Sequence, residues 1–432
     1  MRNVTAPMDF ADMEPEDVAS RIAQAMHTST AIRATPYGWP DPKSLPTRQW
    51  LLGHWLLRGE VTAIIAPGGT GKSTIVTALA LSLASGRPLL GKPLPHGPQS
   101  TWIYNLEDAQ DELHRQVAAA SLLHGIVPND CRNRLYVDSG LVQPLCTAIE
   151  DRDGFAIAEN TFVQIAATVR ESGISIVIVD PFVSSHTVRE NSNEAIDAIA
   201  KRWKRLAQET GCAVVLVHHT KKLGGRDVTA EDGRGAVALR DAARVVLTLN
   251  AMGQTEAKEL GITDPALCRS LVRVDTGKAN RALRDAATWI KLESQCLDNG
   301  TDSEPVDFVG AAALWEKPDI FHGVTAEHLR IVQQGLVTGN WRENVQATDW
   351  IGNLVASVVK LSVETDKARI KAILRMWFGS GALVKEIRSD RKGNLRPFVT
   401  AGHPVAPAEI ESHPHSAKWG EIGGESEGDD LR

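Results

Sequence analysis

One stretch of nine residues constrains the fold of this 432-residue chain more than any other feature. It follows an apolar run over residues 61–65 and precedes a helix-like stretch over 75–83. A strand, a glycine-rich loop and a helix, in that order, are typical of a P-loop, in which backbone N–H groups turn toward phosphate oxygens at a helix N-terminus. The sequence therefore predicts that the chain binds a nucleoside triphosphate. The loop consists of Ala66, Pro67, Gly68, Gly69, Thr70, Gly71, Lys72, Ser73 and Thr74.

Two side chains of this loop bear on the chemistry. Lys72 is long enough to reach the β- and γ-phosphates, and the hydroxyl of Ser73 suits Mg²⁺. Ala66 stands where the usual pattern has glycine, but a small residue suffices where the strand ends. We therefore expect Mg²⁺ to accompany the nucleotide.

The composition narrows the class of protein. A net charge of -6 provides no overall basic surface, so any contact with nucleic acid must come from local clusters of cations. The five cysteines are scattered and odd in number, which argues against a disulfide framework and a zinc site. No stretch reaches the ~18 apolar residues that a membrane helix needs, and residues 1–16 contain no apolar targeting segment. We expect a cytoplasmic protein that does not bind membranes.

Strand-like and helix-like segments alternate along the first two thirds of the chain. This alternation predicts an α/β fold with a mostly parallel sheet flanked by helices. Helical periodicity is clear over 162–170 and 195–207, each just before a strand. We expect an arm and linker over 1–47 and the nucleotide-binding core over 48–300. The strand-like runs are 61–65, 101–106, 174–179, 213–217, 244–249 and 271–274.

The pattern changes after residue 300. A linker is expected over 301–323, and residues 324–402 then read as three helices followed by a β-hairpin. This is the layout of a small winged-helix-like α+β domain. The acidic residues 403–432 resemble a disordered tail. The expected helices are 326–336, 348–361 and 365–378, and the expected strands are 382–387 and 395–400.

Three polar positions at strand ends are candidates for roles in the hydrolysis of the bound nucleotide. Asp180 closes a buried apolar strand and, with Ser73, is placed to hold Mg²⁺, although an ordinary surface aspartate remains the alternative. Glu107 follows another strand and is our candidate general base. Its alternative is a helix-capping role, which also suits Asp108. His218 and His219 follow a third strand, and one of them is a candidate sensor of the γ-phosphate, with a structural role as the alternative.

Seven ordered motifs together resemble the RecA-type hexameric ATPases of the plasmid RepA helicase kind. The resemblance covers roughly residues 48–293 and implies a RecA-like P-loop core that binds ATP. In that family the acid after the second strand is the catalytic base, and a histidine after the fourth strand links the γ-phosphate to a DNA-facing loop. Glu107 and His219 look like these residues. The motifs lie at 67–73, 107–108, 180–181, 190–191, 218–219, 234–235 and 278–280.

The resemblance also implies a ring of identical subunits, in which a neighbour's arginine completes each ATP site. Arg234 is the best candidate for this arginine finger and Lys278 is a second, while the alternative for both is an ordinary surface cation. The family also has an arginine in the helix after the base. Arg115 is the nearest, but its spacing from Glu107 is one residue short.

Two segments of the core are candidates for contact with single-stranded DNA, namely 184–193 and 220–233, the latter containing Lys221, Lys222 and Arg226. Solvated loops are the alternative. Near the C-terminus, cations gather on the third helix and the hairpin, a pattern that favours duplex DNA but also suits a protein contact. This arrangement resembles ATPases of phages and integrated elements. These cations are Lys367, Arg369, Lys371, Arg375, Lys385, Arg388, Arg391, Lys392 and Arg396.

The leading hypothesis is a ring-forming, ATP-hydrolysing motor that acts on DNA, as a replicative helicase of a mobile element. An ATP-switched DNA-binding regulator or loader is the alternative from another class. A strand-exchange recombinase shares the RecA core and differs by filament assembly. A partition ATPase ranks last, because Pro67 occupies the position of that group's signature lysine.

Overall fold

The computed structural model describes residues 34–150, 154–220, 226–229, 232, 236–260, 262, 264–279, 281, 286–317, 319–389 and 394–403. The chain divides into two units, Met1–Thr47 and Arg48–Arg432. Among the described residues of the first unit, only Pro42–Ser44 form a short 3-10 turn, which the Asp41 carboxylate caps. Residues 1–33 of the expected arm and residues 404–432 of the expected tail lie outside the described residues.

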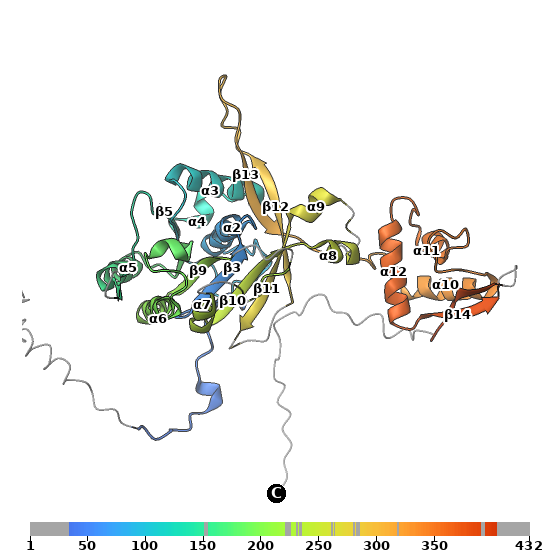
Figure 1. Cartoon of the computed structure of the whole chain (residues 1–432), viewed down its shortest axis with the longest axis horizontal. Coiled ribbons are helices and arrows are strands. Elements are labelled where there is room, and N and C mark those ends of the chain that lie inside the picture. Colours follow the sequence, from blue (N-terminus) through green and yellow to red (C-terminus); the bar gives the residue numbers. More distant parts are fainter. Residues whose placement is uncertain are drawn as a thin grey trace, which may run out of the picture. The chain divides into compact units, whose positions relative to one another are not determined.

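A nine-stranded sheet forms the centre of the second unit (Figure 1). Its strand order is β13-β12-β11-β10-β3-β9-β8-β4-β5. In this order the six strands from β10 to β5 run parallel, whereas β11, β12 and β13 each pair antiparallel with their neighbours. The mostly parallel sheet expected from the sequence is therefore confirmed. The parallel strands are β3 (Val61–Pro67), β4 (Thr101–Asn105), β5 (Leu135–Ser139), β8 (Ile176–Asp180), β9 (Ala213–Thr220) and β10 (Val245–Ala251). The antiparallel strands are β11 (Leu271–Ala279), β12 (Thr288–Cys296) and β13 (Phe308–Leu314).

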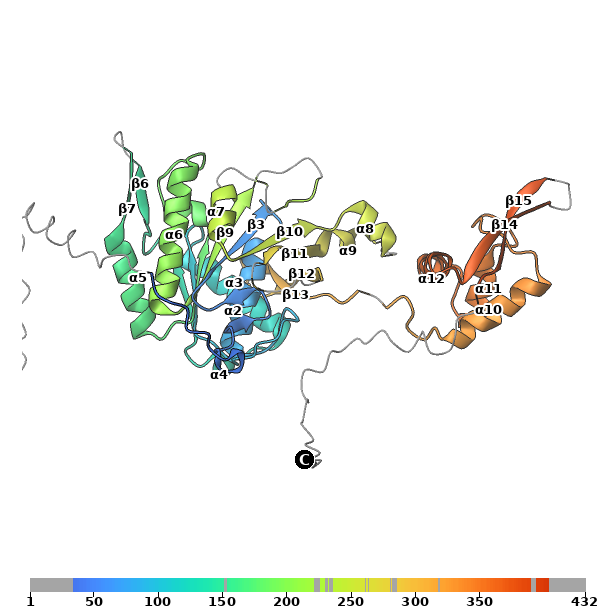
Figure 2. The same ribbon diagram turned by 90° about the horizontal axis from the view of Figure 1, so that it is seen from below.

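Helices cover both faces of the sheet (Figure 2). One face packs against α2 (Lys72–Ser85), α3 (Gln110–His124) and α4 (Pro128–Cys131). The other packs against α5 (Glu159–Glu171), α6 (Asn193–Thr210) and α7 (Ala236–Ala242). Because the central strands are buried on both faces, they consist of nearly continuous apolar residues.

Smaller elements complete this part of the chain. Two short hairpins, β1 (Trp50–Leu52) with β2 (Leu56–Leu57) and β6 (Ala148–Glu150) with β7 (Phe155–Ile157), lie outside the main sheet. A 3-10 turn, η3 (Phe182–Ser185), follows β8. Two short helices, α8 (Gln254–Glu259) and α9 (Pro265–Ser270), connect β10 to β11.

The core sheet extends beyond residue 300. β13 lies within the expected linker 301–323, yet all of its residues pair with β12. Residues 297–307, which include the expected boundary at residue 300, are the connection between these two strands.

The C-terminal part forms three helices and a hairpin, as the sequence predicts. These are α10 (Ala326–Thr338), α11 (Ile351–Val359), α12 (Lys367–Gly379), β14 (Leu383–Ser389) and β15 (Leu395–Ala401). They share a hydrophobic core of their own. Its members include Trp350, Ile373, Leu374 and Trp377, with Phe378 packed against them.

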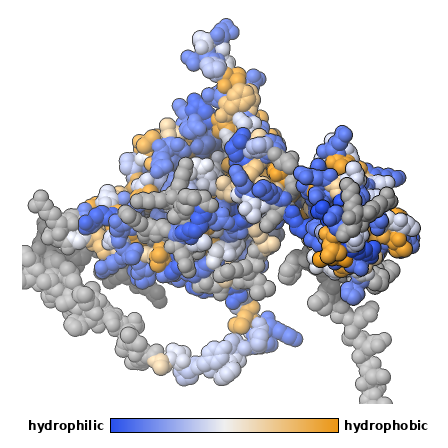
Figure 3. Space-filling view, turned by 45° about the vertical axis from the view of Figure 1, so that its right-hand side comes forward, coloured by the Kyte–Doolittle hydropathy of each residue, from blue (hydrophilic) through white to orange (hydrophobic). Residues whose placement is uncertain are grey.

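Hydrophilic residues cover most of the face of the molecule seen in Figure 3, with hydrophobic residues scattered between them. Among the described helices, none combines the length and the apolar character needed to cross a membrane.

Candidate nucleotide site

The P-loop connects β3 to α2 and has the backbone that phosphate binding needs. Gly69 and Gly71 have φ values of 77° and 82°, which only glycine adopts without strain. A Cβ on Gly71 would also lie 2.6 Å from Cδ1 of Leu292, whereas the space beside Gly68 and Gly69 is open. Because no side chain caps the first turn of α2, its N–H groups are left for an anion. The loop therefore fits a bound phosphate chain.

Lys72 lies inside this loop. Its side chain is buried, and Nζ donates hydrogen bonds to the carbonyl oxygens of Pro67 at 2.7 Å and Ala66 at 3.3 Å. Burial lowers the pKa of Lys72, while the nearby carboxylates of Asp180 and Glu107 raise it. The ammonium therefore lies between the loop and both predicted acidic residues.

Asp180 ends β8 and is only 2 % exposed. Burial raises its pKa to about 6, and the hydrogen bond from the Ser73 hydroxyl opposes that shift. A hydroxyl and a carboxylate oxygen are ligands that Mg²⁺ prefers, so this pair fits the expected ion. When bound, Mg²⁺ neutralises charge on the phosphates.

Glu107 follows β4 at the same edge of the sheet and is exposed. Asn105 fixes the backbone here, because its Oδ1 accepts from the N–H groups of Glu107 at 2.9 Å and Asp108 at 2.8 Å. The Asp108 carboxylate accepts from Asn105 and Gln116. Glu107 Oε1 instead lies 3.5 Å from Oγ of Ser184, in the segment after β8. Asp108 thus stabilises the turn, and the Glu107 carboxylate remains available to the candidate site.

His219 lies in β9 directly beside Ala66 of β3. Burial lowers its pKa, and Lys72 acts in the same direction, while Glu107 and Glu190 oppose both. The imidazole therefore lies near Lys72 and Glu107. Its neighbour His218 is more deeply buried and lies close to His186.

Sequence reasoning missed two buried polar residues near this edge. Asn105 is 3 % exposed at the last position of an apolar strand, and a polar residue in that position before Glu-Asp was the available signal. His186 is buried against Phe182, with ring centroids 5.1 Å apart. No pattern in the sequence marked His186.

Other predicted residues lie elsewhere. Lys278 pairs in register with Val246, and its Nζ donates to the carbonyl oxygen of Arg240 at the end of α7, away from Lys72 of the same chain. Arg115 forms ion pairs with Asp307 and Glu112. Arg234 lies outside the described residues, as do Lys221 and Lys222.

Structural contacts occupy some of the predicted DNA-contacting cations. Arg369 donates to the backbone carbonyl groups of Ile320 and His322, so it holds the C-terminal part together instead of facing a ligand. Three further cations form ion pairs: Arg226 with Asp232, Lys385 with Glu343, and Arg388 with Glu386. Lys367, Lys371 and Arg375 are exposed along α12. Arg391 and Lys392 lie outside the described residues.

A family model matches the part of the chain that carries this site. Residues 27–225 match the model of a family described as an AAA domain. The matched residues include the P-loop, Glu107, Asp180 and His219. Among solved structures, the crystal structure of the RadB recombinase is similar, with 12 % sequence identity and a TM-score of 0.36. That match covers 55 % of this chain and 88 % of the recombinase, and at so low a score it carries no conclusion.

Within this part of the chain, four strands bring the candidate groups together. β3, β9, β8 and β4 are neighbours and end at one edge of the sheet, which carries Lys72, His219, Asp180 and Glu107. Ligands of open parallel sheets bind at this edge. The arrangement supplies a cationic cradle for phosphates, a pair of oxygen ligands for a metal ion and a carboxylate able to accept a proton.

Proposed function

We propose that this protein hydrolyses ATP with Mg²⁺ and uses the hydrolysis to move along DNA, as a replicative helicase of a phage, plasmid or integrated element. The single observation that carries the proposal is the position of Glu107. Its carboxylate is near enough to Lys72 and Asp180 to raise the pKa of both, and its Oε1 lies 3.5 Å from Oγ of Ser184. Ser184 begins the first candidate DNA-contacting segment, so the proposed base is in contact with a segment that DNA would displace.

The roles of the site residues follow from this arrangement. Glu107 accepts the proton of the attacking water, and Lys72 and the P-loop N–H groups hold the phosphates. Ser73 and Asp180 hold Mg²⁺. His219 senses the γ-phosphate from the end of β9, where the second candidate DNA-contacting segment begins.

The helicase assignment also rests on assembly. Lys278 lies away from Lys72 of its own chain, a position that suits a residue acting on a neighbour's nucleotide. We propose that Arg234 and Lys278 complete the ATP site of the next subunit in a ring. A residue that acts across a repeated head-to-tail interface favours such a closed assembly.

Three measurements test the proposal in order. ATP turnover of the wild type is measured with and without single-stranded DNA, its assembly by size-exclusion mass, and strand displacement on a forked duplex. We expect a ring whose turnover rises with DNA and which separates the strands. Hydrolysis without strand separation or movement would contradict the helicase activity and leave the ATPase standing.

A second candidate is a DNA-binding regulator or loader in which ATP switches assembly. The exposed cations of α12 favour it, because a helix of this kind enters the major groove in many regulators. Footprinting on duplex DNA separates the two: a dimer on one site, with turnover that DNA does not change, supports the regulator.

A further inference from the structure

The β14–β15 hairpin carries an exposed apolar surface on one of its faces. In an antiparallel pair, opposite residues share a face of the sheet, and so do alternate residues along each strand. Leu383 and Val399 belong to the core of the C-terminal part, so they mark the inner face of the hairpin. The register places Ile387, Leu395 and Pro397 on that same face. Ile387 and Leu395 are nevertheless 71 % and 74 % exposed. We call these three residues the apolar strip.

The apolar strip is exposed because the hairpin continues past the helices that cover its inner face. Leu395 is four residues from the buried Val399, which is about 13 Å along the strand. Figure 2 shows the free end of the hairpin extending beyond α10, α11 and α12. The apolar pattern of the inner face thus continues beyond the core that explains it. An exposed apolar surface with a polar rim is typical of an interaction site.

The opposite face of the hairpin carries positive charge. Arg388 and Arg396 are register partners on this face. Glu386, on the same face, forms an ion pair with Arg388. Like charges directly opposite each other destabilise a pair of strands. A negatively charged ligand near both guanidinium groups would offset their repulsion.

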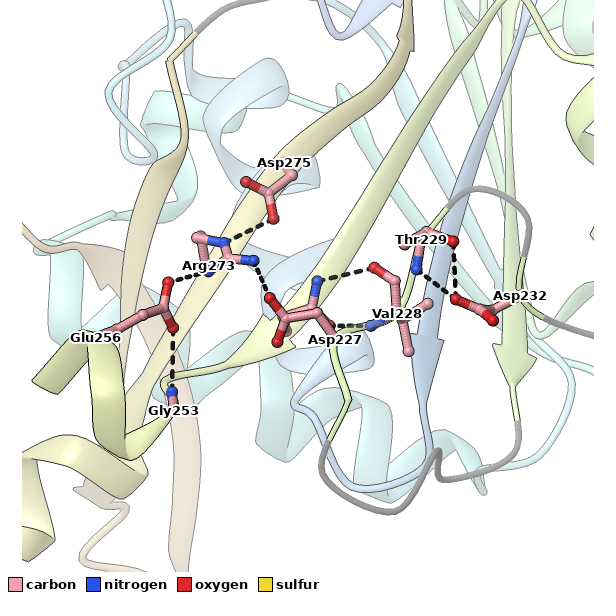
Figure 4. A network of polar contacts seen from close by, with 9 residues as sticks. Asp227, Val228, Thr229, Asp232, Gly253, Glu256, Arg273 and Asp275 are labelled. Atoms are coloured by element: carbon pink, nitrogen blue, oxygen red, sulfur yellow. Dashed lines mark hydrogen bonds and ion pairs between the residues drawn. The ribbon is translucent and has the colours of Figure 1, made fainter.

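An arginine in the large sheet has different surroundings. Arg273, in β11, has the uncharged Asn250 as its register partner. Its guanidinium forms ion pairs with three carboxylates, those of Asp227, Glu256 and Asp275 (Figure 4). The C-terminal part has the opposite balance, because residues 324–402 contain 12 lysines and arginines but seven aspartates and glutamates, in a chain of net charge -6. The hairpin therefore suits an anionic partner.

Nucleic acid offers a surface that matches each face of the hairpin. Its phosphates are negative, and its bases have flat faces that leucine, isoleucine and proline side chains contact when a step is unstacked. Inside a duplex, neighbouring pairs cover each base pair, so such a contact first requires unstacking. At a junction between double- and single-stranded DNA, the last base pair already exposes one face. The hairpin therefore fits such a junction better than a continuous duplex.

We propose that the apolar strip packs against the last base pair at a junction between double- and single-stranded DNA, while Arg388 and Arg396 contact nearby phosphates. By covering this face, the strip prevents separated bases from stacking on it again and so favours the open side of the junction. This inference rests on the proposed function for its purpose, because a motor that separates strands works at such a junction.

A forked DNA with 2-aminopurine as its first unpaired base tests the inference on the full chain, without nucleotide. In free DNA this base stacks on the last pair, and its fluorescence rises when the strip takes its place. We expect the wild type to cause this rise. The same label in the middle of the duplex should not respond.

The strip variant is Ile387→Thr with Leu395→Thr, which keeps side chains suited to strands. It should lose the fluorescence rise, and its affinity for the forked DNA should fall roughly tenfold, as expected for partial burial of two aliphatic side chains. Affinity for a duplex closed by loops at both ends should stay as in the wild type. The control is Ile331→Thr with Val337→Thr on α10, where the side chains are also exposed. This control should behave as the wild type, and unfolding temperature is recorded for both variants.

The charged face is tested separately. Arg388→Gln with Arg396→Gln should weaken binding of the forked DNA and of the closed duplex by similar factors. It should also reduce the dependence of log affinity on log salt by about 2, because two phosphate contacts are lost. The two faces of the hairpin would then have different effects on the same pair of DNAs.

The outcomes separate this inference from the proposed function. A fluorescence rise in the strip variant equal to that of the wild type would overturn the inference, as would an equal loss in the α10 control. A lower assembly mass of the strip variant with an unchanged rise would assign the strip to a contact between copies of the chain, which also overturns it. A wild type that causes the rise but separates no strands with ATP contradicts the proposed function and leaves the junction contact standing.

Discussion

Glu107 is the residue on which the proposed hydrolysis depends. Its backbone is fixed by Asn105, and its carboxylate is not used by the turn, whereas the neighbouring carboxylate of Asp108 accepts two hydrogen bonds. We expect Glu107→Gln to lower ATP turnover by about 10²- to 10⁴-fold, the usual contribution of a general base, without weakening nucleotide binding. Phosphate release and binding of a fluorescent ATP analogue measure the two effects.

Asp108→Asn is the matched control for this prediction. It makes the same change, from a carboxylate to an amide, one residue along the chain. Because the Asp108 side chain stabilises the turn and does not face the nucleotide, this variant should lower turnover far less. Equal losses in the two variants would show that the turn, and not the proton transfer, is what the substitutions disturb.

Asp180 makes the stability of the metal-free protein depend on pH. Its folded pKa of about 6 lies above the ordinary value of 3.8, so the folded state binds the proton more tightly than the unfolded state. The contribution of Asp180 to stability is therefore greatest below pH 4, falls as the pH rises to 6, and stays lower above it. In a chelating buffer at pH 8, we expect Asp180→Asn to be more stable than the wild type by up to about 3 kcal/mol. Urea unfolding at pH 8 and pH 5 measures this difference, which should shrink at the lower pH.

The candidate site shows what can be predicted about single residues from the sequence. Lys72, Asp180, Glu107 and His219 follow strands in recognisable patterns, and the structure places them together, although their roles stay predictions. Asn105 accepts from N–H groups only two and three residues along the chain, and it was missed because its burial depends on the fold. Nothing local distinguishes such an asparagine from one in a turn.

At the scale of elements, the exposed cations of α12 support a prediction about duplex DNA. Lys371 and Arg375 lie one turn apart on the helix and are both exposed. Reversing both charges should weaken duplex binding roughly 10- to 100-fold and reduce the dependence of log affinity on log salt by about 2. Fluorescence anisotropy over a series of salt concentrations provides both numbers.

The control for α12 is on α6. Lys201 and Arg205 have the same spacing and are also exposed, so reversing them changes the net charge equally. Their reversal should leave duplex affinity near that of the wild type. A similar loss in both double variants would indicate a general effect of net charge, and the assignment of α12 to DNA would then be wrong.

The elements themselves were predictable to different degrees. Strands such as β8 and β9 were found because burial on both faces makes them continuous apolar runs. β5 and β12 were missed because polar residues interrupt their apolar pattern, whereas β13 consists of small and apolar residues inside the expected linker. The pairing of β13 with β12 depends on contacts across the sheet, which a single sequence does not contain.

For the whole molecule, the proposed ring can be tested by mixing two inactive variants. Glu107→Gln removes the base of a subunit's own site, and Arg234→Ala removes the residue proposed to reach the neighbouring site. In an equal mixture, roughly a quarter of head-to-tail interfaces join an intact site to an intact arginine. We therefore expect turnover to return to about a quarter of the wild-type value, measured as phosphate release after co-assembly.

The outcome of mixing separates action between subunits from action within one. If Arg234 acts on its own chain, every subunit in the mixture lacks one essential group and no turnover returns. Lys278→Ala in place of Arg234→Ala repeats the test for the second candidate. Size-exclusion mass of the mixture confirms that the two variants share assemblies.

The pairing of β10 with β3 has a consequence for the expression of parts of this protein. The AAA match ends at residue 225, yet β10 supplies the hydrogen-bond partners on one side of β3, the strand that leads into the P-loop. A recombinant fragment cut at the end of the match would leave that strand as an unpaired, mostly apolar edge of the sheet, which favours aggregation. The matched residues are thus fewer than the residues that the sheet needs in order to fold. A recombinant fragment should extend past Leu314, where the last strand of the sheet ends.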